Sequence, residues 1–190
     1  MLQASLFKDA PMQSTGGTKI PVGVHNGGVF FQGLNNEAGW TDINFSNNDG
    51  RSIHKRLFTP TGSFPKNGEN IQEAYNREVD RNLKSLVHVM EALLGAEVIE
   101  TFGAADYKGF ISAATLLLTP LKGTEVNLKV VPDWKEGIFP DLPMTRFVEK
   151  HQEGVPTQLR LSKDQEKAVA EMEAKRNVSK EEDVAAGKYY

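Results

Sequence analysis

The chain has 190 residues, of which 39% are hydrophobic, which is enough for one domain with a sizeable core plus tails. Its 22 basic and 25 acidic residues give a net charge of −3, which excludes a uniformly basic, histone-like protein, so any nucleic-acid binding must be local. The absence of cysteine excludes a disulfide framework, a thiol nucleophile and cysteine-ligated metal sites.

The first 20 residues show no sustained period and are interrupted by Pro11, Gly16 and Gly17. We interpret residues 1–20 as a flexible arm. The folded domain is then expected over residues 21–152, and residues 153–190 are expected to form a flexible, partly helical C-terminal tail.

Three segments with β character follow, at residues 29–31, 40–45 and 52–58. The last two are separated by a turn with the pair Asp49-Gly50, which suits a tight hairpin. These segments predict a three-stranded meander.

After a loop rich in proline and glycine, the hydrophobic period changes from two to 3.6 residues. Asn70 and Glu73 have the spacing of a capping box, and Gly95 ends the pattern. One apolar stripe is expected along this helix, formed by Ile71, Tyr75, Val79, Leu83, Leu86, Val87, Met90 and Leu94. A second helix is predicted over residues 107–118 and is ended by Pro120.

The β period returns at residues 125–131, where apolar and polar residues alternate, and a last short strand is predicted at residues 143–148. The predicted order is therefore three strands, two helices and two strands. Residues 162–176 are rich in Glu, Lys and Ala and predict one weak helix within the tail.

Catalytic and metal-binding motifs are lacking. The four histidines, His25, His54, His88 and His151, are too scattered for a local metal motif, and the sequence contains neither a P-loop nor a G-x-S-x-G elbow. His88 lies beside the helical stripe, where a partly buried histidine is expected. We therefore expect a non-enzymatic protein without metal or cofactor.

The most distinctive feature is the segment of residues 51–58, which contains the third predicted strand and carries three permanent positive charges, a histidine and an aromatic residue but no acid. In the second strand, Ile43 and Phe45 share the parity of a core face, which leaves Trp40 on the outer face. Aromatic rings beside cations suit single-stranded nucleic acids, whose bases stack on rings while cations follow the phosphates. The candidate residues on these strands are Trp40, Arg51, His54, Lys55, Arg56 and Phe58.

An alternative interpretation of the same residues is structural. Trp40 could pack under the first loop or the helix, Phe58 could belong to the core, and the three basic residues could protect an edge strand from pairing.

The predicted fold class is α+β, a β-barrel with an α insertion, because two helices between a third and a fourth strand match the connectivity of the five-stranded OB-fold. The strand and helix spacing over residues 21–150 resembles phage single-stranded DNA-binding proteins. The segments that carry this resemblance are residues 23–26, 40–45, 53–60, 126–131 and 142–143. The resemblance implies that Lys129 and Trp134, on and after the fourth strand, also line the nucleic-acid groove.

Proteins of this functional type often end in an acidic tail with a terminal aromatic residue that recruits replication partners. The end of this chain is similar, although Lys188 and the short acidic run depart from the pattern. The residues concerned are Glu181, Glu182, Asp183, Tyr189 and Tyr190. The alternative is a merely solvated terminus.

The resemblance implies a phage-encoded protein that coats single-stranded DNA in the host cytoplasm during replication or recombination. Its partners would be single-stranded DNA and, through the tail, replication or recombination proteins. No membrane attachment is expected, because no apolar stretch approaches the ~20 residues that span a bilayer. The alternative is a structural or protein-interaction module of a phage particle, and a nuclease is disfavoured because no constellation of carboxylates or histidines is visible.

Overall fold

The structure is a computed structural model that describes residues 19–133, 137 and 139–185. Most of the predicted arm lies outside these residues. The arm prediction is wrong at its end, because Ile20 is fully buried and Lys19 pairs with Ser52 in a parallel bridge. The backbone amide of Ile20 donates to the carbonyl of Ser52, so the domain already begins at the start of the described chain.

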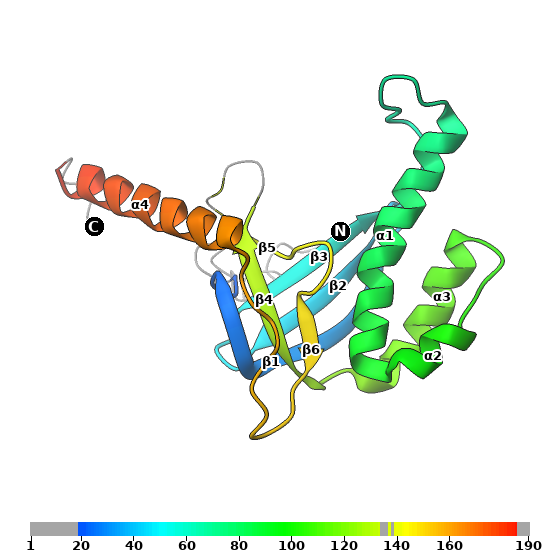
Figure 1. The fold of residues 1–190 in the computed structure, drawn as a ribbon, viewed down its shortest axis with the longest axis horizontal. Helices are drawn as coiled ribbons and strands as arrows, with labels where there is room; N and C mark the ends of the chain where they lie inside the picture. The colour runs from blue at the N-terminus through cyan, green and yellow to red at the C-terminus, as the bar shows by residue number, and fades with distance from the viewer. Residues whose placement is uncertain (1–18, 134–136, 138, 186–190) are drawn as a thin grey trace, which may run out of the picture.

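The described residues form a six-stranded antiparallel sheet (Figure 1). The path through the sheet is β3-β2-β1-β4-β5, and β6 pairs with β4. The strands are β1 (Gly23–Asn36), β2 (Trp40–Asn47), β3 (Ser52–Phe58), β4 (Glu125–Pro132), β5 (Pro140–Asp141) and β6 (Val148–Lys150). The predicted three-stranded meander is confirmed. β1 is much longer than predicted, since glycines and register shifts interrupt its hydrophobic alternation.

The α+β class is confirmed, but the sheet is not closed and the structure therefore does not confirm a barrel. Among the described residues, β3 and β5 are the two ends of the strand path. The side chain of Lys55 on β3 spans the gap between them: its ammonium donates to the carbonyl of Leu142 and lies 3.9 Å from the Asp141 carboxylate.

The strand predicted at residues 143–148 is wrong, since only Val148 belongs to a strand. Pro143 lacks an amide hydrogen, and Arg146 has a φ of 55°, so the segment cannot continue a regular ladder. Side chains satisfy its backbone groups instead. Ser85 donates to the carbonyl of Met144, and Nε2 of the partly buried His88 accepts the amide of Phe147 at 3.1 Å.

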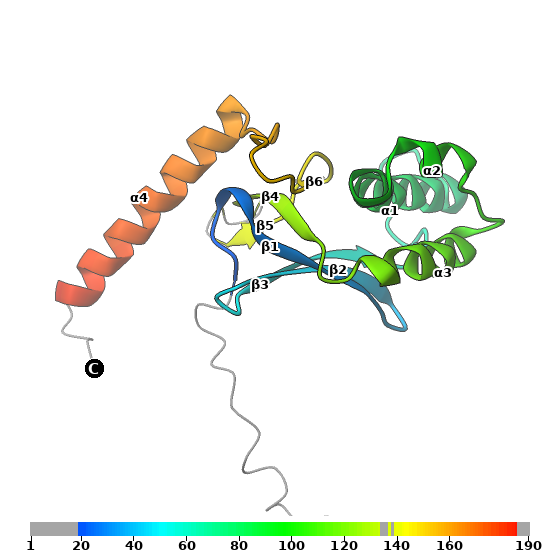
Figure 2. The same ribbon diagram turned by 90° about the horizontal axis from the view of Figure 1, so that it is seen from below.

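The helices are α1 (Ile71–Leu94), α2 (Ala96–Thr101), α3 (Tyr107–Leu118), a 3₁₀ turn (Thr119–Leu121) and α4 (Lys163–Ala185). The predicted capping box at the start of α1 is confirmed. α2 was not predicted because six residues are too few to show a helical period. Figure 2 shows α1, α2 and α3 gathered at one end of the sheet and α4 projecting from the other end. None of the described helices is long and apolar enough to cross a bilayer.

The core lies between the sheet and the C-terminal half of α1. Phe45 is at its centre, tilted against Phe31 at 5.9 Å and edge-on to Phe147 at 6.3 Å between ring centroids. The predicted flexible tail is partly anchored, because Leu159 and Met172 are buried. The burial of these two large apolar side chains removes them from water. It holds the segment after β6 and the first half of α4 against the sheet.

Candidate nucleic-acid interface

The outer face of the β2–β3 hairpin carries three cross-strand pairs. β2 and β3 pair without a register shift, which places Trp40 opposite Phe58, Asp42 opposite Arg56 and Asn44 opposite His54. Residues directly opposite each other share a face of the sheet. Ile43 and Phe45, with the other parity, are fully buried, as the sequence predicted.

Arg56 is held between Trp40 and Asp42. Its Nε and Nη2 donate to the two oxygens of Asp42 at 2.9 and 2.8 Å, and its guanidinium carbon lies 4.6 Å from the centroid of the Trp40 ring. The hydrogen bonds from Arg56 lower the pKa of the Asp42 carboxyl, which is 7% exposed. The positive charge of Arg56 is therefore largely neutralised, and one side of the Trp40 ring is covered.

Sequence reasoning did not identify Asp42 as the partner of Arg56, although the register of the β-hairpin could have revealed it. The third strand contains no acid, but the acid lies directly across the sheet. Counting charges along one strand overestimates the free charge on this face.

Lys55 does not lie with His54 and Arg56. It has the parity of the buried residues Ile53 and Leu57. Its ammonium contacts the Asp141 carboxylate, in β5, and the carbonyl of Leu142, directly after β5. Burial lowers its pKa, although Asp141 acts in the opposite direction. The structure thus gives Lys55 a bridging position between the sheet edges.

Phe58 is 60% exposed, so the alternative that it belongs to the core is wrong. Arg51 and His54 are also exposed to solvent. β3 is at the same time an edge strand, so edge protection by its cations stays a valid interpretation alongside binding.

Lys129 is 7% exposed and does not line an open groove. The prediction fails because β4 is covered on both faces: the segment that follows β6 crosses it, and the Lys129 ammonium donates to the carbonyl of Arg160 at 3.1 Å. Burial lowers the pKa of this lysine, with the nearby Arg146 contributing.

The remaining predicted site residues fall at the limits of what is described. Trp134, Tyr189 and Tyr190 lie outside the described residues, and the backbone of Glu181, Glu182 and Asp183 lies in the last part of α4.

A cleft of about 1070 Å³ runs along the free edge of β3. Its other walls are α1, residues 131–133 and 139–144, Lys19 and the beginning of α4. Three large apolar side chains at this cleft are exposed: Phe58, Phe139 and Met144. Large apolar side chains that are exposed together in this way are a typical contact surface for a partner with flat apolar groups.

Cations also line the cleft. The ammonium of Lys19 lies 5.9 Å from the centroid of the Phe139 ring, and Arg81, on α1, is exposed and forms no ion pair with the described residues. Asp133, Asp141 and Asp164 line the same cleft, and Asp141 faces Lys55. Sequence reasoning missed Lys19, Arg81, Phe139 and Met144, because they come from three separate segments with no common motif.

The first half of α1 contacts this region through polar side chains. The predicted apolar stripe is wrong here, since Ile71 is 71% exposed while Glu78 and Asn82 are buried. Ser85, just past the middle of the helix, is buried as well. Asn82 donates to the carbonyl of Phe58 at 2.7 Å and also bonds the Tyr107 hydroxyl. Buried polar groups need such partners, and every buried side-chain nitrogen and oxygen of the described residues has one.

Among the described residues, no group of three histidine or carboxylate side chains could hold a metal ion. No protein-family model, curated protein or solved structure matches the chain. The features that indicate a function are therefore those of the cleft itself: exposed aromatic rings, cations and the outer edge of β3.

Proposed function

We propose that this protein binds single-stranded DNA with little sequence preference, at the cleft along β3. The observation that carries the proposal is the pair of exposed rings, Phe58 and Phe139, at one cleft that also presents the cations of Lys19 and Arg81.

Single strands fit this surface better than duplexes do. Each base that stacks on an aromatic side chain contributes about 1–3 kcal/mol, and any base offers a flat face, which makes such binding tolerant of sequence. A duplex hides its base faces in the stack. The cations then follow the phosphates, and only local charge is needed in a protein with a net charge of −3.

The strand order supports relating this sheet to the OB-fold. Pairing β3 with β5 would close the path β3-β2-β1-β4-β5 into a five-stranded barrel, and Lys55 already connects these two edges through its side chain. On this basis we retain the proposal of a non-enzymatic, phage-type single-stranded DNA-binding protein that acts in replication or recombination in the host cytoplasm.

The proposal is tested by fluorescence anisotropy with a labelled oligo-dT and the matching duplex, at several salt concentrations. We expect tighter binding to the single strand, with a log–log salt slope of about −0.7 for each phosphate neutralised. Equal binding to both, or a slope near zero, would contradict the proposal.

The acidic end is proposed to recruit replication or recombination proteins. Deleting residues 181–190 should leave the affinity for oligo-dT unchanged, because the residues of α4 that line the cleft, Asp164, Gln165 and Ala168, come well before position 181 in the chain. Loss of DNA affinity on deletion would contradict a separate role in partner binding.

A second candidate is a protein-interaction module of a phage particle. The observation that favours it is the pair of adjacent exposed leucines on α3, Leu116 and Leu117. Sedimentation without DNA distinguishes the two: a large stable assembly that does not bind oligo-dT would favour this second function.

A further inference from the structure

Three exposed apolar residues are fixed by the same helix. Each has its backbone carbonyl hydrogen-bonded by a polar side chain of α1. The three bonds are Arg77 Nη2 to Phe64 O at 2.8 Å, Asn82 Nδ2 to Phe58 O at 2.7 Å and Ser85 Oγ to Met144 O at 2.8 Å. Phe58 and Met144 line the cleft along β3, whereas Phe64 lies outside it.

The three anchoring residues follow one another along the helix axis. At a rise of 1.5 Å per residue, the anchors at 77, 82 and 85 are separated by about 7.5 and about 4.5 Å along α1. The apolar residues they hold are therefore anchored in the order Met144, Phe58, Phe64 toward the N-terminus of the helix. Figure 1 shows that the loop carrying Phe64 projects at that end of α1.

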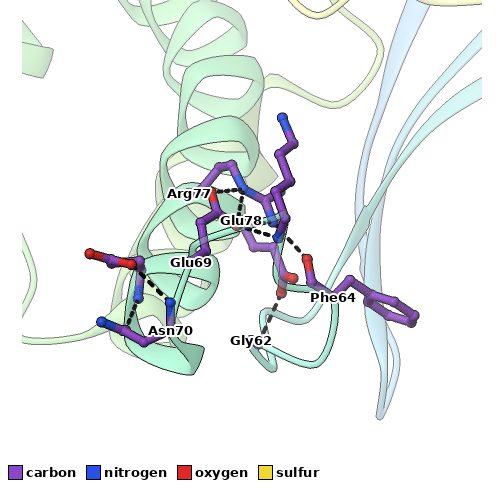
Figure 3. A network of polar contacts seen from close by, with 8 residues as sticks. Gly62, Phe64, Glu69, Asn70, Arg77 and Glu78 are labelled. Atoms are coloured by element: carbon purple, nitrogen blue, oxygen red, sulfur yellow. Dashed lines mark hydrogen bonds and ion pairs between the residues drawn. The ribbon is translucent and has the colours of Figure 1, made fainter.

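The loop is built to keep one shape. Glu78, which is buried, accepts the backbone amide of Thr61 at 2.9 Å. It also accepts the backbone amide of Gly62 at 3.2 Å (Figure 3). Gly62 has a φ of +69°, and a Cβ there would lie 2.5 Å from the carbonyl oxygen of Ile71, so only glycine fits. The amides of Thr61 and Gly62 lower the pKa of Glu78, which keeps it charged.

The second part of the loop is held as firmly. Arg77 pairs with Glu69 at 3.0 Å, and Glu69 accepts the amide of Lys66 at 2.7 Å. The capping box of Asn70 and Glu73 then begins the helix. All of these bonds are internal, yet the ring of Phe64 is 78% exposed and points away from the network in Figure 3. An ordered loop that presents an exposed ring loses little conformational entropy when it binds a partner.

We propose that Phe64 is a further base-stacking residue of the same single-stranded DNA site, so that the bound strand follows α1 from Met144 over Phe58 to Phe64. This inference rests on the function proposed above. It names a second contact region of that site, the loop of residues 59–70, which follows Phe58 directly in the chain.

The cation of Lys66 favours a nucleic acid over a basic protein segment as the occupant of the loop surface. The carboxylates of Glu69, Glu73 and Glu78 are all occupied by internal hydrogen bonds. Lys66 is exposed and forms no ion pair with the described residues, so its ammonium is available to a phosphate beside a base stacked on Phe64.

The test compares two lengths of oligo-dT, one of about four nucleotides that covers only the cleft and one of about 16. Phe64→Ala should weaken binding of the longer strand by about 5- to 150-fold, the equivalent of one lost stacking contact, and leave the shorter one unaffected. Phe58→Ala should weaken both. Leu116→Ala, which removes a side chain of similar exposure (76%) outside the cleft, is the matched control and should change neither.

The outcomes separate the two proposals. If the unmodified protein binds neither oligonucleotide, the proposed function fails. If it binds both and Phe64→Ala behaves like Leu116→Ala at both lengths, the extended site is wrong while the proposed function stands. Arg77→Gln should mimic Phe64→Ala, and the double variant should lose no more than either single one, because Arg77 acts through the position of Phe64.

Discussion

In the C-terminal half of α1, Leu86, Val89 and Met90 are fully buried in the core, whereas the N-terminal half buries Glu78 and Asn82 against backbone groups of the surrounding loops. Packing of the apolar half requires only apolar neighbours of complementary shape, because the hydrophobic effect is non-directional. The polar half fixes particular amides and carbonyls in particular places. One half of the helix therefore stabilises the domain, and the other positions the exposed residues of the candidate site.

The largest expected effect lies in the apolar half. Leu86→Ala should reduce the free energy of unfolding by about 2–5 kcal/mol, because it leaves a cavity in the core. Urea unfolding measures the loss, and oligo-dT affinity of the folded fraction should not change. A loss below 1 kcal/mol would show that this half does not dominate stability.

The polar half should give a smaller loss that depends on pH. Glu78→Gln should cost about 1–3 kcal/mol near neutral pH, since charged hydrogen bonds to two amides are weakened. The folded pKa of Glu78 lies below its ordinary value of 4.5, so its contribution is present above that pH and is lost as the pH falls through the folded pKa. Unfolding measured across this range should show a smaller acid-induced loss in Glu78→Gln than in the unmodified protein.

Substitution of the two aromatic residues on the outer face of the β2–β3 hairpin should weaken oligo-dT binding to different extents. Phe58→Ala should weaken oligo-dT binding by about 1–3 kcal/mol, because its ring is open to a base. Trp40→Ala should have the smaller effect, because Arg56 already covers one side of its ring. Anisotropy titrations of both variants measure this, with circular dichroism as the check on folding. The reverse order would mean that Arg56 leaves Trp40 when DNA binds.

The smallest expected effect concerns His88, a partly buried polar residue within the C-terminal half of α1. Burial lowers its folded pKa below the ordinary 6.5, and Nε2 accepts the amides of Phe147 and Val148. Its contribution is therefore complete above pH 6.5 and declines as the pH falls below it. His88→Gln should flatten the stability profile just below pH 6.5, and an unchanged profile would contradict this role.

The sequence predicted what local patterns determine. The β2–β3 hairpin, the capping box at Asn70 and the long helix to Gly95 follow from turn chemistry, side-chain spacing and period. The outer position of Trp40 followed from strand parity alone.

Contacts between distant segments could not be predicted in this way. Asp42 neutralises Arg56 across the sheet, and Lys129 is covered by a segment 31 residues further along the chain. The cleft brings together Lys19, Phe58 and Phe139, which no sequence spacing relates. The buried polar residues of α1, Glu78, Asn82 and Ser85, have helical spacing too, but a search for periodic hydrophobic residues does not detect them.

The most direct test of single-stranded DNA binding at the cleft along β3 is to map which residues contact the bound strand. Amide ¹H–¹⁵N spectra recorded during titration with oligo-dT should show their largest changes at Phe58, Met144 and Lys19, and with longer strands at Phe64. Changes centred on Leu116 and Leu117 of α3, or no changes at saturating oligonucleotide, would contradict single-strand binding at this cleft.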